Sequence, residues 1–249
     1  MANLYAPCFY DYFKKLKLMT DSVVFRNPKV CNDVLTSPEL SSISSQRRNS
    51  YNCLQLGIMA SGSGTNFEAI AKAIALKELD AEIKVLIYNN PQAKAAERAK
   101  KYNIPAVLID HRQYKKREDL DRQIVKTLQS YGVDWVIMAG WMRIITQVLL
   151  NAYPQRAINI HPSLLPSFKG IRAIEQALAA GVKITGCTVH IVSLEVDSGE
   201  IIMQAAVPIL PEDNLETLHE RIQRQEHRIL PQAIALAAIS TQQQISTND

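Results

Sequence analysis

Two polar side chains at the end of a short apolar run have the types that acyl-transfer chemistry uses. Asn159 and His161 begin the segment NIHPSLLP, and because they are two residues apart they face the same way on a strand. An amide donor and an imidazole that converge on one point can stabilise an oxyanion and move a proton. The alternative is structural, with Asn159 capping the strand and His161 hydrogen-bonded in a proline-rich loop. An isolated Asn-x-His favours that alternative, so other parts of the chain must decide.

A Gly-rich turn supplies a second candidate site. The segment SGSGTN, residues 61–66, follows a predicted strand and opens a predicted helix. Its glycines let the backbone approach a ligand, and free amides at a helix N-terminus favour a phosphate. We predict a phosphate site here, with a structural tight turn as the alternative. The third glycine of a dinucleotide loop and the Gly-Lys-Ser/Thr of a P-loop are both missing from this turn.

A carboxylate between two β-rich runs is the third candidate. Asp197 lies in the segment EVDSGE, residues 195–200, whose Asp-Ser-Gly is ordinary turn chemistry. Alone, Asp197 is a turn former. It takes a catalytic role only if the fold brings it to His161.

The elements that must position these residues alternate between short apolar runs and helical stretches. Such alternation predicts βαβ units, and therefore an α/β fold with a mostly parallel, twisted, Rossmann-like sheet and helices on both faces. Two later β-rich runs predict an antiparallel hairpin in the C-terminal half. The expected strands are 54–60, 83–88, 106–109, 134–139, 157–160, 184–192 and 200–210, and the expected helices lie near 66–77, 93–102, 115–131 and 215–239, the last one kinked or interrupted at Pro231.

Composition predicts three parts in this chain of 249 residues: an N-terminal extension at 1–53 that is partly disordered, a catalytic domain at 54–240 and a flexible tail at 241–249. Lys and Arg outnumber Asp and Glu by 7 to 4 in the extension and by 21 to 20 in the rest. The nearly neutral body argues against a nucleic-acid partner.

Other classes are also disfavoured by the sequence. No apolar run approaches the roughly 18 residues of a membrane span, and the acidic residues Asp11, Asp21 and Asp33 are atypical of an organellar transit peptide. We therefore expect a cytoplasmic protein without a membrane partner. The four cysteines have no spacing that is typical of a metal site, and none is expected.

Six segments occur together in an order and spacing that resemble the phosphoribosylglycinamide formyltransferase family, over roughly residues 54–239. They are SGSGTN, MAGWMRI, NIHPSLLPSF, GCTVH, EVDSG and RIQRQEH. The resemblance implies a folate-dependent transferase of one-carbon metabolism. Its co-substrate would be 10-formyltetrahydrofolate, and it would transfer the formyl group to the amine of 5-phosphoribosylglycinamide in de novo purine biosynthesis.

The resemblance also implies roles for individual residues. The catalytic trio falls on Asn159, His161 and Asp197, and the carboxylate would hold the histidine and favour its imidazolium form. The remaining assignments are Gly64, Thr65, Asn66 and Glu226 for the ribonucleotide, and Arg117, Met142, Arg143, Ile144, Ile145 and Asn159 for the folate.

For most of the folate residues, the pattern alone favours other roles. Met142 to Ile145 would otherwise be core packing, and Arg117 a solvated helix charge. His190 is open between lining the site and a hydrogen-bonded core position.

Two other enzyme functions stay open. A 10-formyltetrahydrofolate hydrolase shares the Asn, His and Asp chemistry but needs no phosphate turn. A nucleotide-binding oxidoreductase would need the third glycine that is missing from the Gly-rich turn, and an acidic residue at the position of Asn89. The sequence leaves the oligomeric state and the role of the extension open.

Overall fold

The computed structural model of the protein describes residues 35–38 and 53–246, which belong to the unit Leu35–Asp249. Most of the predicted extension and the last three residues of the predicted tail lie outside the described residues. One sheet of eight strands organises this unit, in the order β1-β8-β7-β6-β5-β2-β3-β4. The strands are β1 Thr36–Ser37, β2 Leu54–Ala60, β3 Ala81–Tyr88, β4 Ala106–Leu108, β5 Trp135–Met138, β6 Ala157–His161, β7 Ile184–Ile191 and β8 Ile201–Pro208.

The sheet has a parallel half and an antiparallel half, as predicted. Strands β2 to β6 pair in parallel, whereas β7 pairs antiparallel with both β6 and β8. The parallel strands β2 and β5 are buried almost throughout, which explains their continuous apolar runs. The helices are α3 Thr65–Ala75, α4 Ala95–Lys101, α5 Arg117–Ser130, α6 Gln147–Ala152, α7 Ala173–Ala180 and α8 Leu215–Ser246, with a 3₁₀ turn at His111–Gln113.

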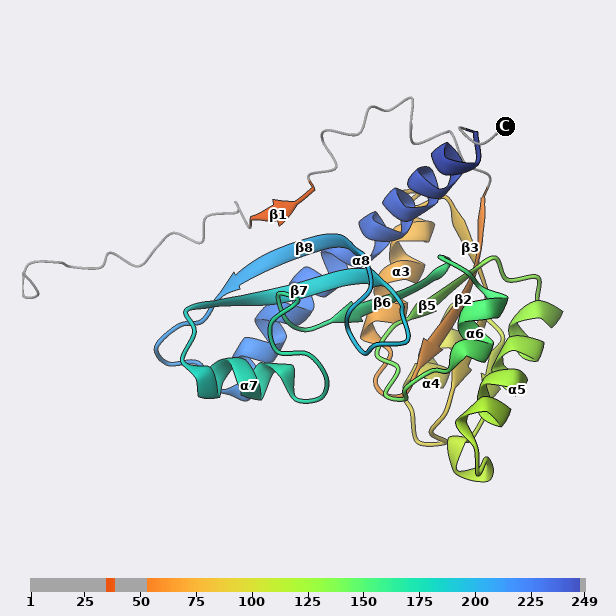
Figure 1. Cartoon of the computed structure of the whole chain (residues 1–249), viewed down its shortest axis with the longest axis horizontal. Coiled ribbons are helices and arrows are strands. Elements are labelled where there is room, and N and C mark those ends of the chain that lie inside the picture. Colours follow the sequence, from red (N-terminus) through yellow and green to blue (C-terminus); the bar gives the residue numbers. More distant parts are fainter. Residues whose placement is uncertain (1–34, 39–52, 247–249) are drawn as a thin grey trace, which may run out of the picture. The chain divides into compact units, whose positions relative to one another are not determined.

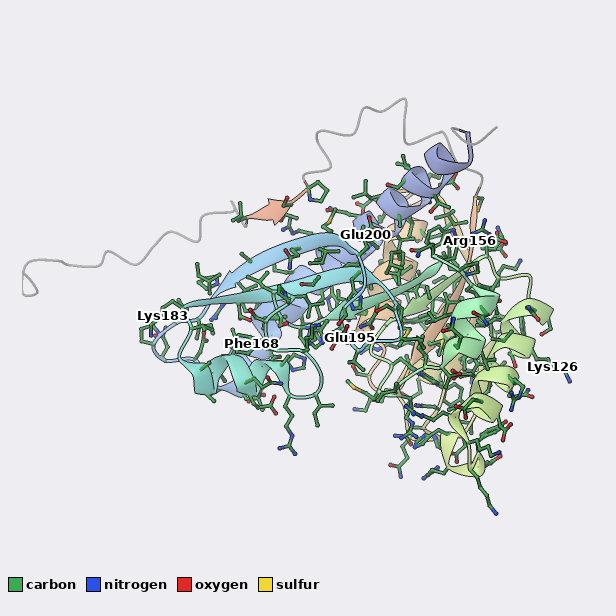
Figure 2. All side chains as sticks on the ribbon, viewed as in Figure 1. Lys126, Arg156, Phe168, Lys183, Glu195 and Glu200 are labelled. Carbon is green, nitrogen blue, oxygen red and sulfur yellow. The ribbon has the colours of Figure 1, made fainter. Side chains whose placement is uncertain are left out.

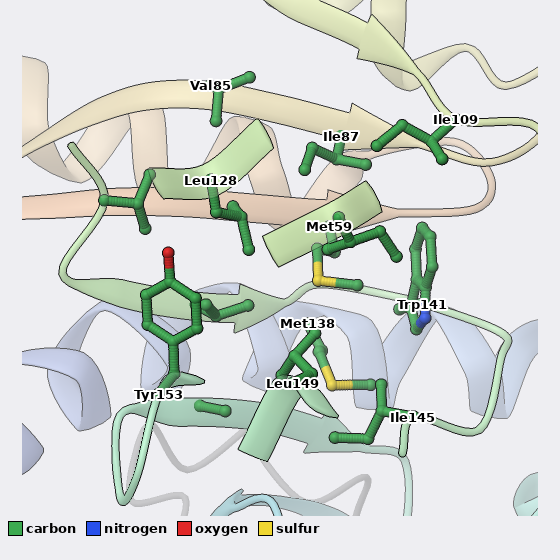
Figure 3. Packing of buried hydrophobic residues seen from close by; sticks show 14 of the residues in the cluster. Met59, Val85, Ile87, Ile109, Leu128, Met138, Trp141, Ile145, Leu149 and Tyr153 are labelled. Atoms are coloured by element: carbon green, nitrogen blue, oxygen red, sulfur yellow. The ribbon is translucent and has the colours of Figure 1, made fainter. Parts of the chain in front are cut away.

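Helices cover both faces of the sheet (Figure 1). On α5, Leu120, Ile124 and Leu128 are buried, whereas Lys126 points away from the sheet (Figure 2). Together with Leu149 of α6 and side chains of β2, β3 and β5, they form one apolar cluster (Figure 3). The helices α3 and α8 pack against each other and cover the opposite face.

Three helices differ from the prediction. The helix α8 runs through Pro231 without interruption and continues to Ser246, into the segment predicted as a tail. Proline removes one helix hydrogen bond, but tertiary packing holds this buried part of α8 together. The helices α6 and α7 were not predicted, because their six and eight residues are too few to show a helical period.

Strand β1 adds an edge to the sheet from within the predicted extension. Thr36 pairs with Ala205 and Ser37 with Gln204, and the Ala206 amide donates to the Leu35 carbonyl over 3.0 Å. Arg228 on α8 also donates to the Thr36 hydroxyl. The edge of β8 is therefore covered by the chain itself.

We expect removal of residues 1–51 to lower the unfolding temperature by only about 2–4 °C, the shift that ~1 kcal/mol produces in a domain of this size. The few lost hydrogen bonds are worth ~1 kcal/mol each and are offset by the ordering of the segment. Thermal unfolding of chains that start at Asn52 and at Leu35 measures this, because the second chain keeps β1. The chain that starts at Asn52 could instead unfold more than roughly 10 °C below the full-length chain while the chain that starts at Leu35 does not. That result would show that β1 is an essential part of the fold.

Candidate active site

Four polar side chains share one face of the sheet where β6 meets β7. The register places Asn159 opposite His190 and His161 opposite Thr188. Because residues paired across antiparallel strands point to the same face, the two predicted residues gain His190 and Thr188 as neighbours. His190 thus faces the site, and it is also a buried side chain with both ring nitrogens hydrogen-bonded within the chain, so it fits both alternatives that the sequence left open.

The loop after β7 brings Asp197 to His161, as the catalytic interpretation required. Asp197 Oδ2 lies 3.3 Å from His161 Nδ1, and both side chains are more than nine-tenths buried. His161 Nε2 lies 2.9 Å from the carbonyl oxygen of Phe168. Both ring nitrogens of His161 therefore face acceptors, an arrangement that suits the imidazolium form with two N–H donors.

Asp197 is held as a carboxylate. Burial alone would raise its pKa, but the hydrogen bond from the Gly170 amide and the charge of His161 outweigh burial and hold the pKa below the ordinary value. The Gly170 amide donates to Oδ2 over 2.8 Å. A carboxyl with a depressed pKa is ionised above the ordinary value of about 3.9. Asp197 thus stays negative throughout the neutral range.

His190 orients the amide of Asn159. Its Nδ1 lies 2.8 Å from the Ile191 carbonyl, so this nitrogen carries the proton and Nε2 presents a lone pair. Asn159 Nδ2 lies 3.1 Å from that Nε2 and donates to it. The second hydrogen of the Asn159 amide is left for a ligand.

The loop that carries Asp197 folds back closely over β7 because of a glycine. A Cβ on Gly199 would lie 1.7 Å from the Ile191 carbonyl oxygen. Phe168 and Glu195, labelled in Figure 2, mark the two loops that supply the Phe168 carbonyl and Asp197 to His161. Sequence reasoning missed the Phe168 carbonyl and the Gly170 amide, because main-chain groups leave no trace in residue types.

A cavity of about 450 Å³ borders these side chains. Asn159, His161, His190 and Asp197 line it, and so do Met142 to Ile145 from the loop after β5. Met142 is 76% exposed, so this predicted folate residue is available to a ligand rather than packed in the core. Arg117, at the start of α5, is not among the residues that line the cavity.

The Gly-rich turn opens α3 as predicted. Gly64 has φ 72°, and a Cβ there would lie 2.7 Å from Ala95 Cβ, so α4 packs directly against the turn. The amides of Thr65 and Asn66 belong to the first helical turn, where intrahelical acceptors are lacking. The Met142 amide donates to the Ser61 hydroxyl over 2.8 Å and links the turn to the cavity loop.

A buried polar pair stands behind the turn. Asn66 Nδ2 donates to Glu226 Oε2 over 3.0 Å, and the two side chains come from α3 and α8. Burial raises the pKa of Glu226, and the bond from Asn66 offsets this only in part. Asn66 Oδ1 is buried and has no partner in the described part of the chain. The structure thus brings together Gly64, Thr65, Asn66 and Glu226.

A larger groove, of about 1000 Å³, runs between α3 and α8. It contains Thr65 but none of Asn159, His161 and Asp197. We place the candidate site in the smaller cavity, because the buried polar side chains converge there. Within residues 35–38 and 53–246, no group of three His, Cys, Asp or Glu side chains could hold a metal ion, and no helix has the length and apolarity to cross a membrane.

Solved structures of known enzymes are similar to this fold. A glycinamide ribonucleotide transformylase from Symbiobacterium toebii is 45% identical with a TM-score of 0.74, covering 75% of this chain and 88% of that one. A phosphoribosylglycinamide formyltransferase from Bacillus halodurans is also 45% identical, with a TM-score of 0.70 and coverage of 74% and 93%.

Sequence relatives include both short and long proteins. The phosphoribosylglycinamide formyltransferase of Bacillus subtilis is 42% identical over 180 residues, which are 72% of this chain and 92% of the relative. The human trifunctional purine biosynthetic protein adenosine-3 is 40% identical over 189 residues, but the match spans only 19% of its length. A family model described as formyl transferase matches residues 54–234. The chain therefore belongs to the formyl transferase family.

Proposed function

We propose that the chain transfers the formyl group of 10-formyltetrahydrofolate to the amine of 5-phosphoribosylglycinamide, in de novo purine (IMP) biosynthesis. The observation that carries this proposal is the link between the Gly-rich turn and the cavity, through the bond from the Met142 amide to Ser61. A phosphate held at the turn would place the rest of its ligand toward Asn159 and His161. The names of the bacterial relatives support the same reaction.

The cavity suits the folate donor. Its volume of about 450 Å³ is typical of a site for a small organic molecule, and the exposed apolar side chains of Met142 and Ile144 line it. Ile145 also borders the cavity, but its side chain is buried in the apolar cluster. In our proposal the backbone of residues 142–145 pairs with the edge of the pterin ring. Arg117 contacts the donor only if the donor extends beyond the cavity, so its role is the least supported of the folate assignments.

The acceptor would bind between the turn and α8. The proposed contacts are phosphate to the amides at Gly64, Thr65 and Asn66, and ribose or glycinamide to Glu226. Asn66 Oδ1, which has no partner among the described residues, and the Glu226 carboxyl are acceptors, and the ribose hydroxyls and the glycinamide amine are donors. This complementarity supports the assignment.

The chemical step follows from the groups at the cavity. The neutral amine attacks the formyl carbon, and an N–C bond forms while negative charge grows on the formyl oxygen. The remaining N–H of Asn159 donates to that oxygen, and the positive charge of His161 stabilises it through space. Asp197 holds His161 in place and stabilises its charge. The bond from the formyl carbon to N10 then breaks, and the proton lost by the amine ends on N10 of tetrahydrofolate, directly or through water.

The decisive experiment supplies 10-formyltetrahydrofolate with and without the ribonucleotide and follows the release of tetrahydrofolate. We expect release only when the acceptor is present. Release without the acceptor would indicate a hydrolase, and no release in either mixture would refute the proposal. The step needs no metal, so a chelator should leave the rate unchanged. We also propose a cytoplasmic location, which the acidic residues of the extension support.

Replacing Glu226 with glutamine is expected to raise the KM for the ribonucleotide by up to about tenfold, because the carboxyl loses one acceptor position and a hydrogen bond contributes roughly 0.5–1.5 kcal/mol. The amide oxygen of the glutamine can still accept a hydrogen bond from Asn66, so the fold should be unchanged. Steady-state kinetics with each substrate varied in turn measures the effect. The KM for the folate donor serves as the internal control, and an equal rise in both KM values would contradict the assignment.

A further inference from the structure

The hydroxyl of Thr188 is a buried hydrogen-bond centre behind the candidate site. It donates to the Ser163 carbonyl over 2.7 Å and accepts from the Leu165 amide and from Gln204 Nε2, each over 3.0 Å. Thr188 is fully buried, with no exposed surface. The Thr188 hydroxyl thus uses its one O–H donor and both of its acceptor lone pairs.

Its partners belong to the loop that follows His161. Gln204 Nε2 also donates to the Leu165 carbonyl over 3.0 Å, so β7 and β8 together hold both main-chain groups of Leu165. Ser163 Oγ donates to the Ser167 carbonyl over 2.6 Å and ties the turn internally. The main chain of residues 163–167 is therefore attached to the antiparallel half of the sheet at several points.

The same loop supplies two groups that hold the candidate catalytic residues. The Phe168 carbonyl contacts His161, and the Gly170 amide donates to Asp197. The position of these groups follows from the turn that precedes them. Thr188 itself does not line the cavity, and neither do Ser163 and Gln204.

We propose that Thr188 is a positioning residue for formyl transfer: its hydroxyl fixes the main chain at Ser163 and Leu165 and so sets the Phe168 carbonyl and the Gly170 amide against His161 and Asp197. This inference rests on the function proposed above. The loss of the hydroxyl would leave a buried amide and a buried carbonyl without their partner, and the turn would shift to find others. A small displacement of catalytic groups lowers the rate of the chemical step strongly, because the reacting atoms must meet within narrow limits of distance and angle.

The chain offers a matched control in the same strand. Thr185 is 1% exposed, like Thr188, but its hydroxyl has no hydrogen-bond partner among the described residues. Threonine and valine have nearly the same shape. Thr188→Val and Thr185→Val therefore make the same change at two buried sites of β7, one with a hydrogen-bonded hydroxyl and one without.

We expect Thr188→Val to lower kcat by roughly 10- to 100-fold with both KM values within about threefold, because the machinery is displaced while the ligand contacts stay. Thr188→Ser keeps the hydroxyl and should recover most of the turnover. Thr185→Val should keep kcat and unfold no earlier than the parent, since burying an unpaired hydroxyl is itself costly. The three variants and the parent are compared in full-length form, with unfolding temperatures recorded beside the kinetics.

An activity-free readout separates this inference from the proposed function. Amide hydrogen exchange at Leu165 and Gly170, followed by NMR, should be faster in Thr188→Val and unchanged in Thr185→Val. If the parent released no tetrahydrofolate, the proposed function would fail, and exchange would still report whether Thr188 holds the loop.

Unchanged kcat or unchanged exchange at both amides in Thr188→Val would overturn the inference. So would a lowered unfolding temperature with normal turnover. If the valine variant did not fold, Gln204→Met would take its place. This substitution removes one hydrogen bond to the Thr188 hydroxyl and one to the Leu165 carbonyl, so it should lower kcat as Thr188→Val does.

Discussion

Asn159→Ala is expected to lower kcat for formyl transfer by about 10²–10³, the usual cost of losing one oxyanion donor, and to change both KM values only slightly. The reason lies in the bond from Asn159 Nδ2 to His190 Nε2, which fixes one hydrogen of the amide and leaves the other for the developing charge. His161→Ala should have an effect of similar size, because the charge of the imidazolium is the second proposed source of stabilisation for the developing oxyanion. Single-turnover and steady-state kinetics separate the loss in the chemical step from any loss in binding.

The control for this pair is Asn151→Ala, on the exposed surface of α6. It removes the same kind of side chain outside the site and should leave kcat within about twofold, as surface substitutions usually do. A large rise in KM with normal kcat in Asn159→Ala would mean that the amide binds the donor in its ground state. That result would refute the proposed stabilisation of the transition state.

The parallel half of the sheet was predictable because its strands are buried on both faces, and a strand of that kind shows as an unbroken apolar run. β2 and β5 are examples. The hairpin of β7 and β8 was predictable from two β-rich runs around a turn. The two-residue strand β1 and the six-residue helix α6 are too short to show a period, and their positions depend on the edge of β8 and on the apolar cluster under α5.

The candidate site was predictable only in its side chains. Asn159 and His161 share a face because strand residues alternate, and this follows from spacing alone. The approach of Asp197 depends on the close contact at Gly199, and the Phe168 carbonyl is aimed by a main chain with φ 56° at that residue. A phenylalanine rarely adopts this conformation, so no residue pattern predicts it. Tertiary contacts decided this part of the site.

Gly64→Val is expected to weaken ribonucleotide binding by about 100-fold or more and to leave binding of the folate donor within about twofold. Valine at φ 72° is strained by roughly 1–2 kcal/mol, and its Cβ would lie 2.8 Å from the main chain of Ala95. The Ala95 amide donates to the Gly62 carbonyl over 3.2 Å, so α4 is bonded to the turn and cannot simply move away. The turn must shift instead, and the amides of Thr65 and Asn66 leave their positions around the phosphate.

Calorimetry with each ligand measures both affinities in the Gly64→Val protein. The matched control is Gly181→Ala, because Gly181 has a similar φ of 66° but open space where the Cβ would stand, at the end of α7. It imposes a comparable backbone strain outside the Gly-rich turn, so it should lower the unfolding temperature by a few degrees and keep both affinities. Equal loss of both ligands in Gly64→Val would indicate misfolding. Unchanged ribonucleotide affinity would mean that the phosphate binds elsewhere, since no phosphate could keep its contacts with a turn that has been forced out of place.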